Sequence, residues 1–470
     1  MSATMGWLLT TSLPAQEFNL IHTFNGIGTG FTNLDGYSSH ADLVLSGNTL
    51  YGTAPLGGTN GYGTIFSVNT DGSDFTVLHA FTGAADGTVP DGHLVLCEGT
   101  LYGLVGRGTN LVGGGSIFSM STNGQNFNIL YTFTDSANGA LSNPNGGMVM
   151  GDGALYGTTW QGGITNQGTI FSLNMNGTFT LLHQFSQYTD GENPLGTLVL
   201  TNGILYGTAR NYGTNGVSGG TIFSITTNGL DFTVLRYLGP ATNLSAHTPN
   251  TGLTLNGNTL YGTTAFGGTN NGGTVFAINT DGSGFSVLHS FNTAAGEGKI
   301  PEGELVLGGN TLYGSTLGSG SELRGTIYSV NTDGSSFTTL HTFTQFVNDL
   351  NTNADGSQPY DKPLLSGNVL YGSTTVGGVY GDGTLFSMPI VPLISNLTVA
   401  RTNVTLNAIE GIQNETCVLL ASTNLSLPLA AWTSLATNTL ASGGDFAMTI
   451  TNSPNLSLAR QFYTLQVTLP

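Results

Sequence analysis

"GNTLYGTAPLGGTNGYGTIFSVNTDGSDFTVLHAF" (residues 47–81) holds three strand-like runs between glycine-rich turns, and it returns as "GNTLYGTTAFGGTNNGGTVFAINTDGSGFSVLHSF" at 257–291. Looser copies lie between these two and after them. The tripeptide Leu-Tyr-Gly begins at residues 50, 101, 155, 205, 260, 312 and 370, so the period is 50 to 58 residues. That period is typical of a propeller blade and differs from the shorter periods of most helical repeats.

Each copy divides into four short segments of strand character. A brief apolar run such as "LVL" (94–96) comes first, and "TLYGT", "GTIFSVN" and "FTVLHAF" are typical of the other three. Asn-Gly and Asp-Gly pairs separate the third segment from the fourth, and such pairs close tight β-hairpins. Seven copies of a four-stranded antiparallel unit predict an all-β chain with a seven-bladed β-propeller.

The two ends of the repeat region complement each other. The last copy, "LYGSTTVGGVYGDGTLFSMP", lacks a fourth segment, whereas "FNLIHTF" (18–24) is a fourth segment that precedes the first complete copy. We therefore expect Phe18–Phe24 to pair beside Thr384–Met388 and close the ring, which leaves no blade without a neighbour.

The remaining segments define the predicted domain boundaries. Residues 1–17 have a short apolar run without a basic start, so they are interpreted as a truncated signal peptide or a tail. The propeller is predicted at 18–388 and a linker at 389–392. Residues 393–470 alternate in polarity around Trp432 and predict a small Ig-like β-sandwich, a candidate sorting or attachment domain.

Composition excludes some classes of partner. The chain has 470 residues, a net charge of −18 and only eight Lys and Arg residues, so it lacks the basic surface that nucleic acid requires. No stretch approaches the ~20 apolar residues of a membrane-spanning helix. The acidity favours cations or neutral polymers as partners.

Two repeated residue types are interpreted as structural. The Tyr of Leu-Tyr-Gly occurs in every copy and is expected to pack between blades rather than bind sugar. Five histidines share one position of the fourth segment, and Tyr131 and Arg236 occupy it in the other two copies. Equivalent positions in this outer strand should point apart, which argues against a shared metal site. The histidines are His22, His79, His183, His289 and His341.

The connections from the fourth segment to the next first segment hold 13 of the 26 acidic residues and carry a loose Asp-Gly-x-x-Pro pattern. These acids predict an acidic face around the central channel, with Ca²⁺ as a candidate ligand because loop carboxylates suit it. The alternative is that Asp-Gly starts a turn and Pro stiffens it. The candidate ligand-binding residues are Asp35, Asp86, Asp190, Glu297 and Asp355.

Enzymatic motifs for nucleophilic, zinc or phosphate chemistry do not occur, so no catalytic residue and no cofactor is assigned. Glycoside cleavage by paired loop carboxylates stays open. Glu302 and Glu304 in "PEGEL" form an unrepeated pair and are the first candidates, although a solvated turn is the simpler interpretation of Glu302.

The repeated string "GNTLYGTT…GG…GGTVF…NTDGSGFSVLHSF" resembles the exported bacterial tandem repeat called GloVer, found in choice-of-anchor proteins, over about residues 18–388. The stretch "VLLASTNLSLPLAAWTSLATNT…RQFYTLQV" resembles C-terminal sandwich domains of secreted Verrucomicrobia-type proteins. The resemblance implies export and implies no catalytic residue. Unlike the anchored members, this chain ends "RQFYTLQVTLP", without a hydrophobic helix and basic tail.

These observations favour an exported, non-enzymatic propeller that acts as an extracellular or cell-surface binding or structural module. Its expected partner is a glycan, bound with avidity by repeated weak sites, or another copy of itself in a fibre. The alternative is an extracellular polysaccharide hydrolase or lyase that uses loop carboxylates. An enzyme should gather unrepeated acids and an aromatic residue in one cleft, whereas a scaffold should keep a seven-fold mouth.

Overall fold

The computed structural model describes residues 18–390 with short gaps, and beyond them the backbone of six strands between residues 393 and 468. The gaps are residues 27–31, 40–41, 84, 91, 107–113, 135–146, 187–188, 214–218, 240–245, 319–323 and 348–350. Residues 1–17, the predicted signal peptide or tail, and two residues of the predicted linker lie outside the described part.

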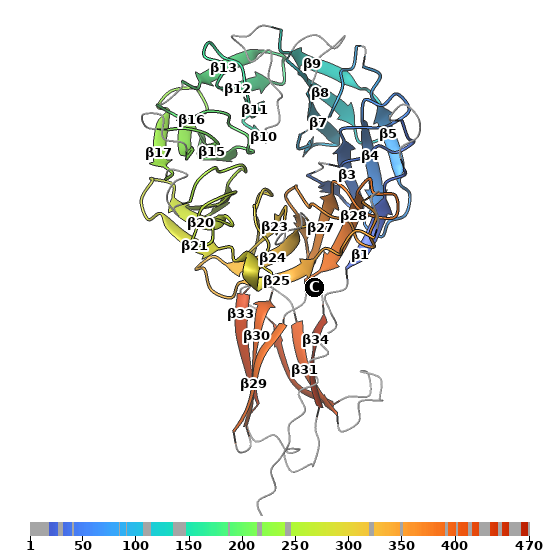
Figure 1. Cartoon of the computed structure of the whole chain (residues 1–470), viewed down its shortest axis with the longest axis vertical. Helices are drawn as coiled ribbons and strands as arrows, with labels where there is room; N and C mark the ends of the chain where they lie inside the picture. Colours follow the sequence, from blue (N-terminus) through green and yellow to red (C-terminus); the bar gives the residue numbers. More distant parts are fainter. Residues whose placement is uncertain are drawn as a thin grey trace, which may run out of the picture.

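Seven four-stranded antiparallel sheets form a ring, as the sequence predicts (Figure 1). In six of the sheets the strands follow one another in chain order from the axis outward, and the first strands of neighbouring blades meet around the axis. The first three blades comprise β2 (Val44–Ser46), β3 (Thr49–Ala54), β4 (Thr64–Asn69) and β5 (Thr76–Ala80); β6 (Val95–Cys97), β7 (Thr100–Val105), β8 (Ser116–Ser121) and β9 (Asn128–Thr132); β10 (Met148–Gly151), β11 (Ala154–Thr159), β12 (Thr169–Asn174) and β13 (Phe179–Gln184).

The next three blades repeat this order, and the seventh takes its outer strand from the start of the chain. They comprise β14 (Val199–Thr201), β15 (Ile204–Ala209), β16 (Thr221–Thr226) and β17 (Thr233–Tyr237); β18 (Thr254–Asn256), β19 (Thr259–Thr264), β20 (Thr274–Asn279) and β21 (Ser286–Ser290); β22 (Val306–Gly308), β23 (Thr311–Thr316), β24 (Thr326–Asn331) and β25 (Thr338–Thr342); and β26 (Leu364–Ser366), β27 (Val369–Thr374), β28 (Thr384–Pro389) and β1 (Asn19–Thr23).

The glycine of Leu-Tyr-Gly is required because an aromatic ring of the adjacent strand lies across it. Gly103 pairs with Phe118, and a Cβ on Gly103 would come within 2.4 Å of the Phe118 ring. The same clash recurs between Gly262 and Phe276 at 2.6 Å. Any larger residue would push the second and third strands apart, so the repeat keeps glycine here.

Ring closure by the N-terminal strand is confirmed. β1 pairs antiparallel with β28, with Leu20 opposite Phe386 and Thr23 opposite Thr384. Seven buried apolar clusters hold the ring together, and each one combines residues of two adjacent blades. The cluster at the seam joins Ile21 and Phe24 of the closing strand to Leu50 and Phe66 of the first complete blade.

The predicted role of the repeated tyrosine is also confirmed. Tyr51, for example, is buried in a cluster with Leu101 and Phe118 of the following blade. Tyr156, Tyr206, Tyr261, Tyr313 and Tyr371 each belong to an interface cluster in the same way, and Tyr102 packs against one.

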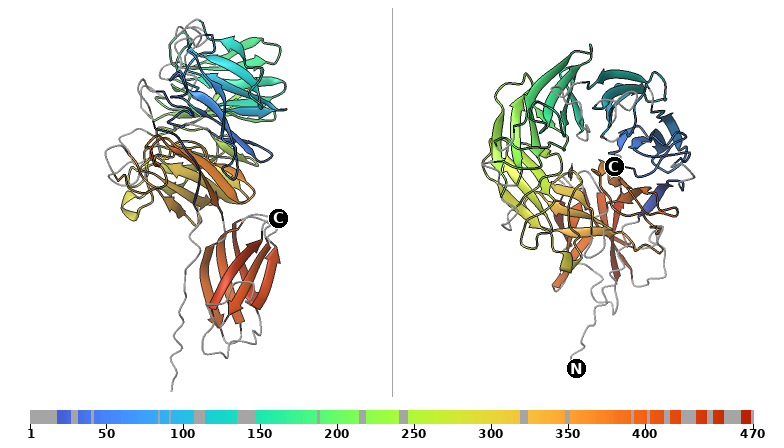
Figure 2. Two further views of the ribbon diagram at one scale, coloured as in Figure 1. Left: turned by 90° about the vertical axis from the view of Figure 1, so that its right-hand side faces the viewer. Right: turned by 45° about the horizontal axis from the view of Figure 1, so that its top comes forward.

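The strands after residue 392 form two three-stranded antiparallel sheets (Figure 2). One contains β29 (Leu393–Ala400), β30 (Asn403–Gly411) and β33 (Gly444–Ile450), and the other contains β32 (Thr433–Thr439), β31 (Thr416–Ser422) and β34 (Phe462–Thr468). The Ig-like assignment of this segment stays a prediction. Among the described residues the only helical element is the 3-10 turn η4 (Thr293–Ala295), and none of their helices has the length and apolarity to span a bilayer.

Deletion of residues 18–24 should destabilise the propeller, because it exposes the seam on both sides. Phe24 is fully buried, and losing such a side chain alone costs about 3–5 kcal/mol. We expect Tm in a calorimetric scan to fall by roughly 10 °C or more. Deletion of residues 1–17 is the control and should leave Tm unchanged. Equal Tm values for the two deletions would contradict closure by this strand.

Candidate functional site

The five predicted ligand-binding carboxylates each bond the histidine of the preceding fourth strand. The contacts, all to the histidine Nε2, are His22–Asp35 at 2.9 Å, His79–Asp86 at 3.1 Å, His183–Asp190 at 2.8 Å, His289–Glu297 at 2.9 Å and His341–Asp355 at 2.9 Å. The pairs lie in five different blades, so the structure does not bring these acids together.

Each carboxylate also anchors its own connection. Asp355 accepts hydrogen bonds from the Thr344 amide at 3.1 Å and from the Thr344 hydroxyl. Burial acts to raise the pKa of Asp355, but the hydrogen bonds from His341 and Thr344 outweigh it and lower the pKa. The following Gly356 has φ +96° and no room for a Cβ beside Thr374 and Thr384. The Asp-Gly pattern therefore has a local structural cause.

The histidines link each connection to the neighbouring blade. His183 stacks on Phe232 with ring centroids 3.8 Å apart, and His289 stacks on Phe337 at 3.7 Å. Where Arg236 replaces histidine, its guanidinium lies 4.5 Å from the centre of the Phe285 ring. Each carboxylate thus orients a ring that packs across a blade interface, which agrees with the structural interpretation of the histidines.

Glu302 and Glu304, the weak catalytic candidates, lie in a different place, at the axis of the ring. Glu304 lies two residues before Val306, the residue of β22 that pairs with the repeated tyrosine Tyr313. The residues at this position in the seven blades form a set that we call the axial ring, and they are nearly all different. They are Asp42, His93, Gly147, Thr197, Gly252, Glu304 and Lys362.

Side chains of the axial ring reach across the axis and bond one another. His93 Nδ1 contacts the Asp42 carboxylate, and it lies 2.8 Å from the Thr197 hydroxyl. Glu304 Oε1 accepts hydrogen bonds from the amides of Thr197 at 2.8 Å and Gly252 at 3.1 Å. These contacts join residues that are 50 to 110 positions apart in sequence, so the axial ring is one connected cluster.

Lys362 completes the cluster. Its Nζ lies 3.3 Å from Glu304 Oε2, and its backbone amide donates to Asp42 Oδ1 at 2.8 Å. Burial acts to lower the pKa of Lys362, but the charges of Glu304 and Asp42 outweigh it and raise the pKa. Two acids and two bases therefore neutralise each other at the axis.

The two glycines of the axial ring make room for these contacts. A Cβ on Gly147 would lie 2.0 Å from the Thr197 hydroxyl, and a Cβ on Gly252 would lie 2.0 Å from Glu304 Oε1. Seven full side chains do not fit at one level of the channel. Two blades therefore contribute backbone alone, and their neighbours occupy the space.

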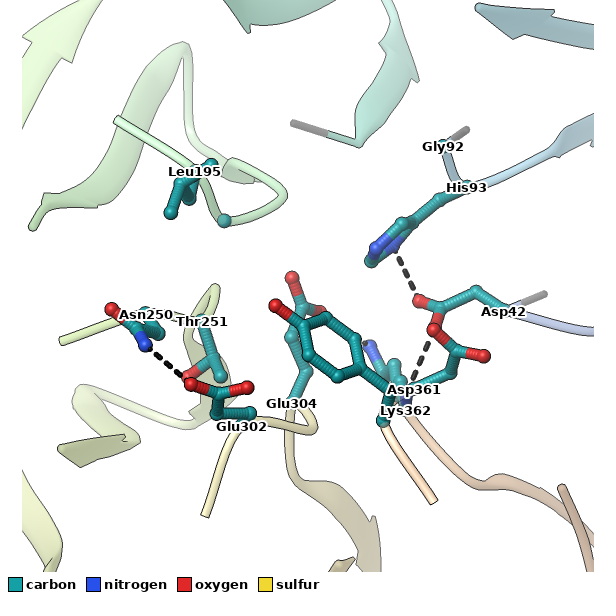
Figure 3. A pocket seen from close by; sticks show the side chains of 12 residues that line it. Asp42, Gly92, His93, Leu195, Asn250, Thr251, Glu302, Glu304, Asp361 and Lys362 are labelled. Atoms are coloured by element: carbon teal, nitrogen blue, oxygen red, sulfur yellow. Dashed lines mark hydrogen bonds and ion pairs between the residues drawn. The ribbon is translucent and has the colours of Figure 1, made fainter. Parts of the chain in front are cut away.

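Two cavities share the four charged residues of the axial ring as a wall. On the side of the fourth-to-first connections lies the one that we call the axial pocket, of about 130 Å³ (Figure 3). Besides these four residues it is lined by Gly92, Leu195, Gly196, Asn250, Thr251, Glu302, Tyr360 and Asp361. The other cavity, of about 240 Å³, is lined mainly by apolar residues such as Leu94, Met148 and Val306. The charged ring thus divides the channel into a polar and an apolar compartment.

His93 carries a positive charge at neutral pH. Burial acts to lower its pKa, but the Asp42 carboxylate, with smaller contributions from Glu304 and Asp361, raises it to about 9. Asp42, His93 and Glu304 have potential ligand atoms within 4.8 Å of one another. A divalent cation there would have to displace the proton on His93 and compete with the Lys362 ammonium. The charges of the axial ring are balanced without it.

Sequence reasoning missed Asp42, His93, Thr197 and Lys362. It identified Glu302 and Glu304 only as an unrepeated pair, not as neighbours of residues from other blades. The signal was present in the alignment of the seven copies, where the position nine residues before each repeated tyrosine changes in almost every blade while its surroundings repeat. A repeated position that lies at the axis and differs among the blades indicates a functional site.

Comparisons with known proteins agree with the fold. A family model described as the Gloeobacter/Verrucomicrobia repeat matches residues 2–219 and 215–402. No curated protein matches the chain in sequence. Among solved structures, an oligogalacturonate lyase in complex with manganese is 12% identical with a TM-score of 0.50, covering 79% of this chain and 96% of the lyase. A putative 6-phosphogluconolactonase from Bacteroides uniformis is 14% identical with a TM-score of 0.45, covering 86% and 98%. The likeness to the lyase concerns the fold alone.

Glu304→Ala should destabilise the ring, because it leaves Lys362 without its partner and removes the acceptor of two backbone amides. We expect the free energy of unfolding in urea to fall by about 3 kcal/mol or more. Glu304→Gln keeps the acceptor and should lose less. Asp281→Ala removes an exposed acid whose hydrogen bonds stay within its own hairpin turn, at Ser283, and should cost about 1 kcal/mol or less. A loss no larger for Glu304→Ala than for Asp281→Ala would show that the cluster does not support the fold.

The raised pKa of His93 makes stability depend on alkaline pH. Its contribution is fully present below pH 6.5, the ordinary value for histidine, and is lost as the pH rises through about 9. Between pH 6.5 and 9.5 the free energy of unfolding of the native chain should fall relative to His93→Gln, by roughly 3 kcal/mol at most. Parallel pH profiles for the two proteins would mean that His93 is not held in its charged form.

Proposed function

Because this chain belongs to the Gloeobacter/Verrucomicrobia repeat family, whose repeats form its ring of blades, we propose that it is an extracellular binding module with one ligand site, the axial pocket. The observation that carries the proposal is the axial ring. Seven equivalent positions differ from one another and form an interacting set of acid, base, hydroxyl and glycine at the floor of the axial pocket.

The size of the pocket sets the kind of ligand. Its volume of about 130 Å³ is below the ~300–1,000 Å³ of sites that enclose a drug-sized molecule. A small polar group at the end of a larger molecule fits such a space. The terminal residue of an extracellular glycan is the partner that we favour, and the predicted C-terminal Ig-like sandwich would serve as the attachment domain.

The unequal residues that the blades contribute to the axial pocket also support a second candidate function, polysaccharide cleavage. Glu302, Asp361 and Tyr360 place two unrepeated acids and an aromatic ring in one cleft, as an enzyme would. Binding is favoured because the acids are engaged by the protein itself. Asn250 donates to Glu302 at 2.9 Å, Ser373 donates to Asp361 at 2.7 Å, and Glu304 accepts two backbone amides.

Filling the pocket tests the proposal. Leu195 lines it, and Leu195→Trp should occlude it without adding charge. The full chain is titrated with soluble bacterial and plant polysaccharides by isothermal calorimetry, and we expect the best ligand to bind at least tenfold more weakly to the variant. Leu230→Trp makes the same change at a side chain that is 62% exposed and should bind normally.

The other outcomes are distinct. Equal affinity in both variants would place any binding outside the pocket and contradict the proposal. Release of shortened sugars during the titration would replace binding by cleavage as the function. If no polysaccharide binds, and electron microscopy with or without Ca²⁺ shows filaments, the chain is an assembly protein.

A further inference from the structure

The axial pocket has a neutral floor and negative walls. The floor is the axial ring, in which Asp42 and Glu304 are balanced by His93 and Lys362. The walls are formed by residues that precede the axial ring in the connections. They contain two acids, Glu302 and Asp361, and no basic residue among the lining residues that the structure describes. The lining as a whole therefore carries two net negative charges.

Asn250 holds one of the two wall acids in place. Asn250 lines the pocket, and its Nδ2 donates to Glu302 Oε1 at 2.9 Å. This contact fixes the orientation of the amide, because a carboxylate accepts hydrogen bonds and cannot donate them. Asn250 Oδ1 is then shielded from solvent and accepts no hydrogen bond. Asn250 thus fixes the position of the Glu302 carboxylate in this wall.

The basic groups of the pocket are committed elsewhere. Lys362 Nζ lies against Glu304, and His93 lies against Asp42, so an anionic ligand would have to compete with internal carboxylates. A cation meets the opposite situation, since carboxylates accept more than one hydrogen bond each. Tyr360, which is 37% exposed, adds an aromatic ring to the wall, and such rings attract ammonium groups.

We propose that the axial pocket binds a protonated amino group, with the carboxylates of Glu302 and Asp361 as acceptors and the aromatic ring of Tyr360 beside it. This inference rests on the proposed function, because it names the ligand chemistry of the same site. Unacetylated amino sugars in glycans present this group, and so do simple alkyl amines. The net charge of −18 gives the whole molecule a field that favours cations.

The test compares two sugars that differ only in the amino group. The β-1,4-linked tetramer of glucosamine and its fully N-acetylated counterpart are titrated into the full chain at pH 6, where the free amines are protonated. We expect the glucosamine tetramer to bind at least tenfold more tightly. Ethanolamine as a competitor separates the sources: displacement at similar concentration means that the amine alone is recognised, and weak displacement means that the sugar contributes.

Charge-removing variants locate the effect. Glu302→Gln and Asp361→Asn keep an acceptor for Asn250 and Ser373, so the local hydrogen bonds survive. Each should weaken binding of the glucosamine tetramer about tenfold and change binding of the acetylated tetramer less than twofold. Asp281→Asn removes one charge from an exposed hairpin turn and should change neither.

The results separate the two levels of the proposal. Equal binding of both tetramers, lost in Leu195→Trp, would keep the pocket as the site and overturn the preference for an amino group. Equal losses of affinity for the glucosamine tetramer in Glu302→Gln, Asp361→Asn and Asp281→Asn would mean that only the overall charge of the protein attracts the amine. That result would also overturn the preference. If Leu195→Trp affects no ligand, the proposed function itself fails.

Discussion

The packing of each blade against the next is the constraint on which the rest of the structure depends. Nearly all the buried apolar side chains that the structure describes in the blades lie in the seven interface clusters, so no blade is complete without both neighbours. Leu-Tyr-Gly, the stacked histidines and the Asp-Gly connections all serve this interface. Their repetition in the sequence follows from a physical need that is the same seven times, and β1 is needed because a ring with one open seam exposes two apolar faces.

The same symmetry explains why the site is asymmetric. Residues in the interfaces are held alike by packing, whereas a residue that faces the axis meets its six equivalents instead of a neighbouring blade. Identical charged residues there would repel one another within a few ångströms. Alternation of acid, base, hydroxyl and glycine removes this repulsion, and Asp42, His93, Glu304 and Lys362 show the result. The pocket thus arises where the repeat is free to vary.

Much of this architecture could be predicted from the sequence, because periodicity and hairpin signals report local geometry. The blade number, the closing strand and the packing of Tyr51 and its equivalents follow from such signals. The pairing of His183 with Asp190 also has a signal in the sequence, although the analysis of the repeats treats the histidines and the acids separately. Where Arg236 replaces the histidine, the connection that follows contains no acid, so the two partners are absent together. The contact between Thr197 and Glu304 was not readable, because it depends on the radius of the ring and not on neighbours in the chain.

The separation of these roles has a consequence for how such a protein can change its ligand. Substitutions of wall residues such as Asn250 or Tyr360 leave the interface clusters intact, since neither residue belongs to one. The axial ring is less free, because Gly147 and Gly252 accept no side chain and Glu304 is bound by two backbone amides. Specificity can therefore vary in the walls at little cost in stability, while the charged floor has to change as a set. Binding sites built on the axis of a repeat ring should accordingly diverge faster at their rims than at their floors.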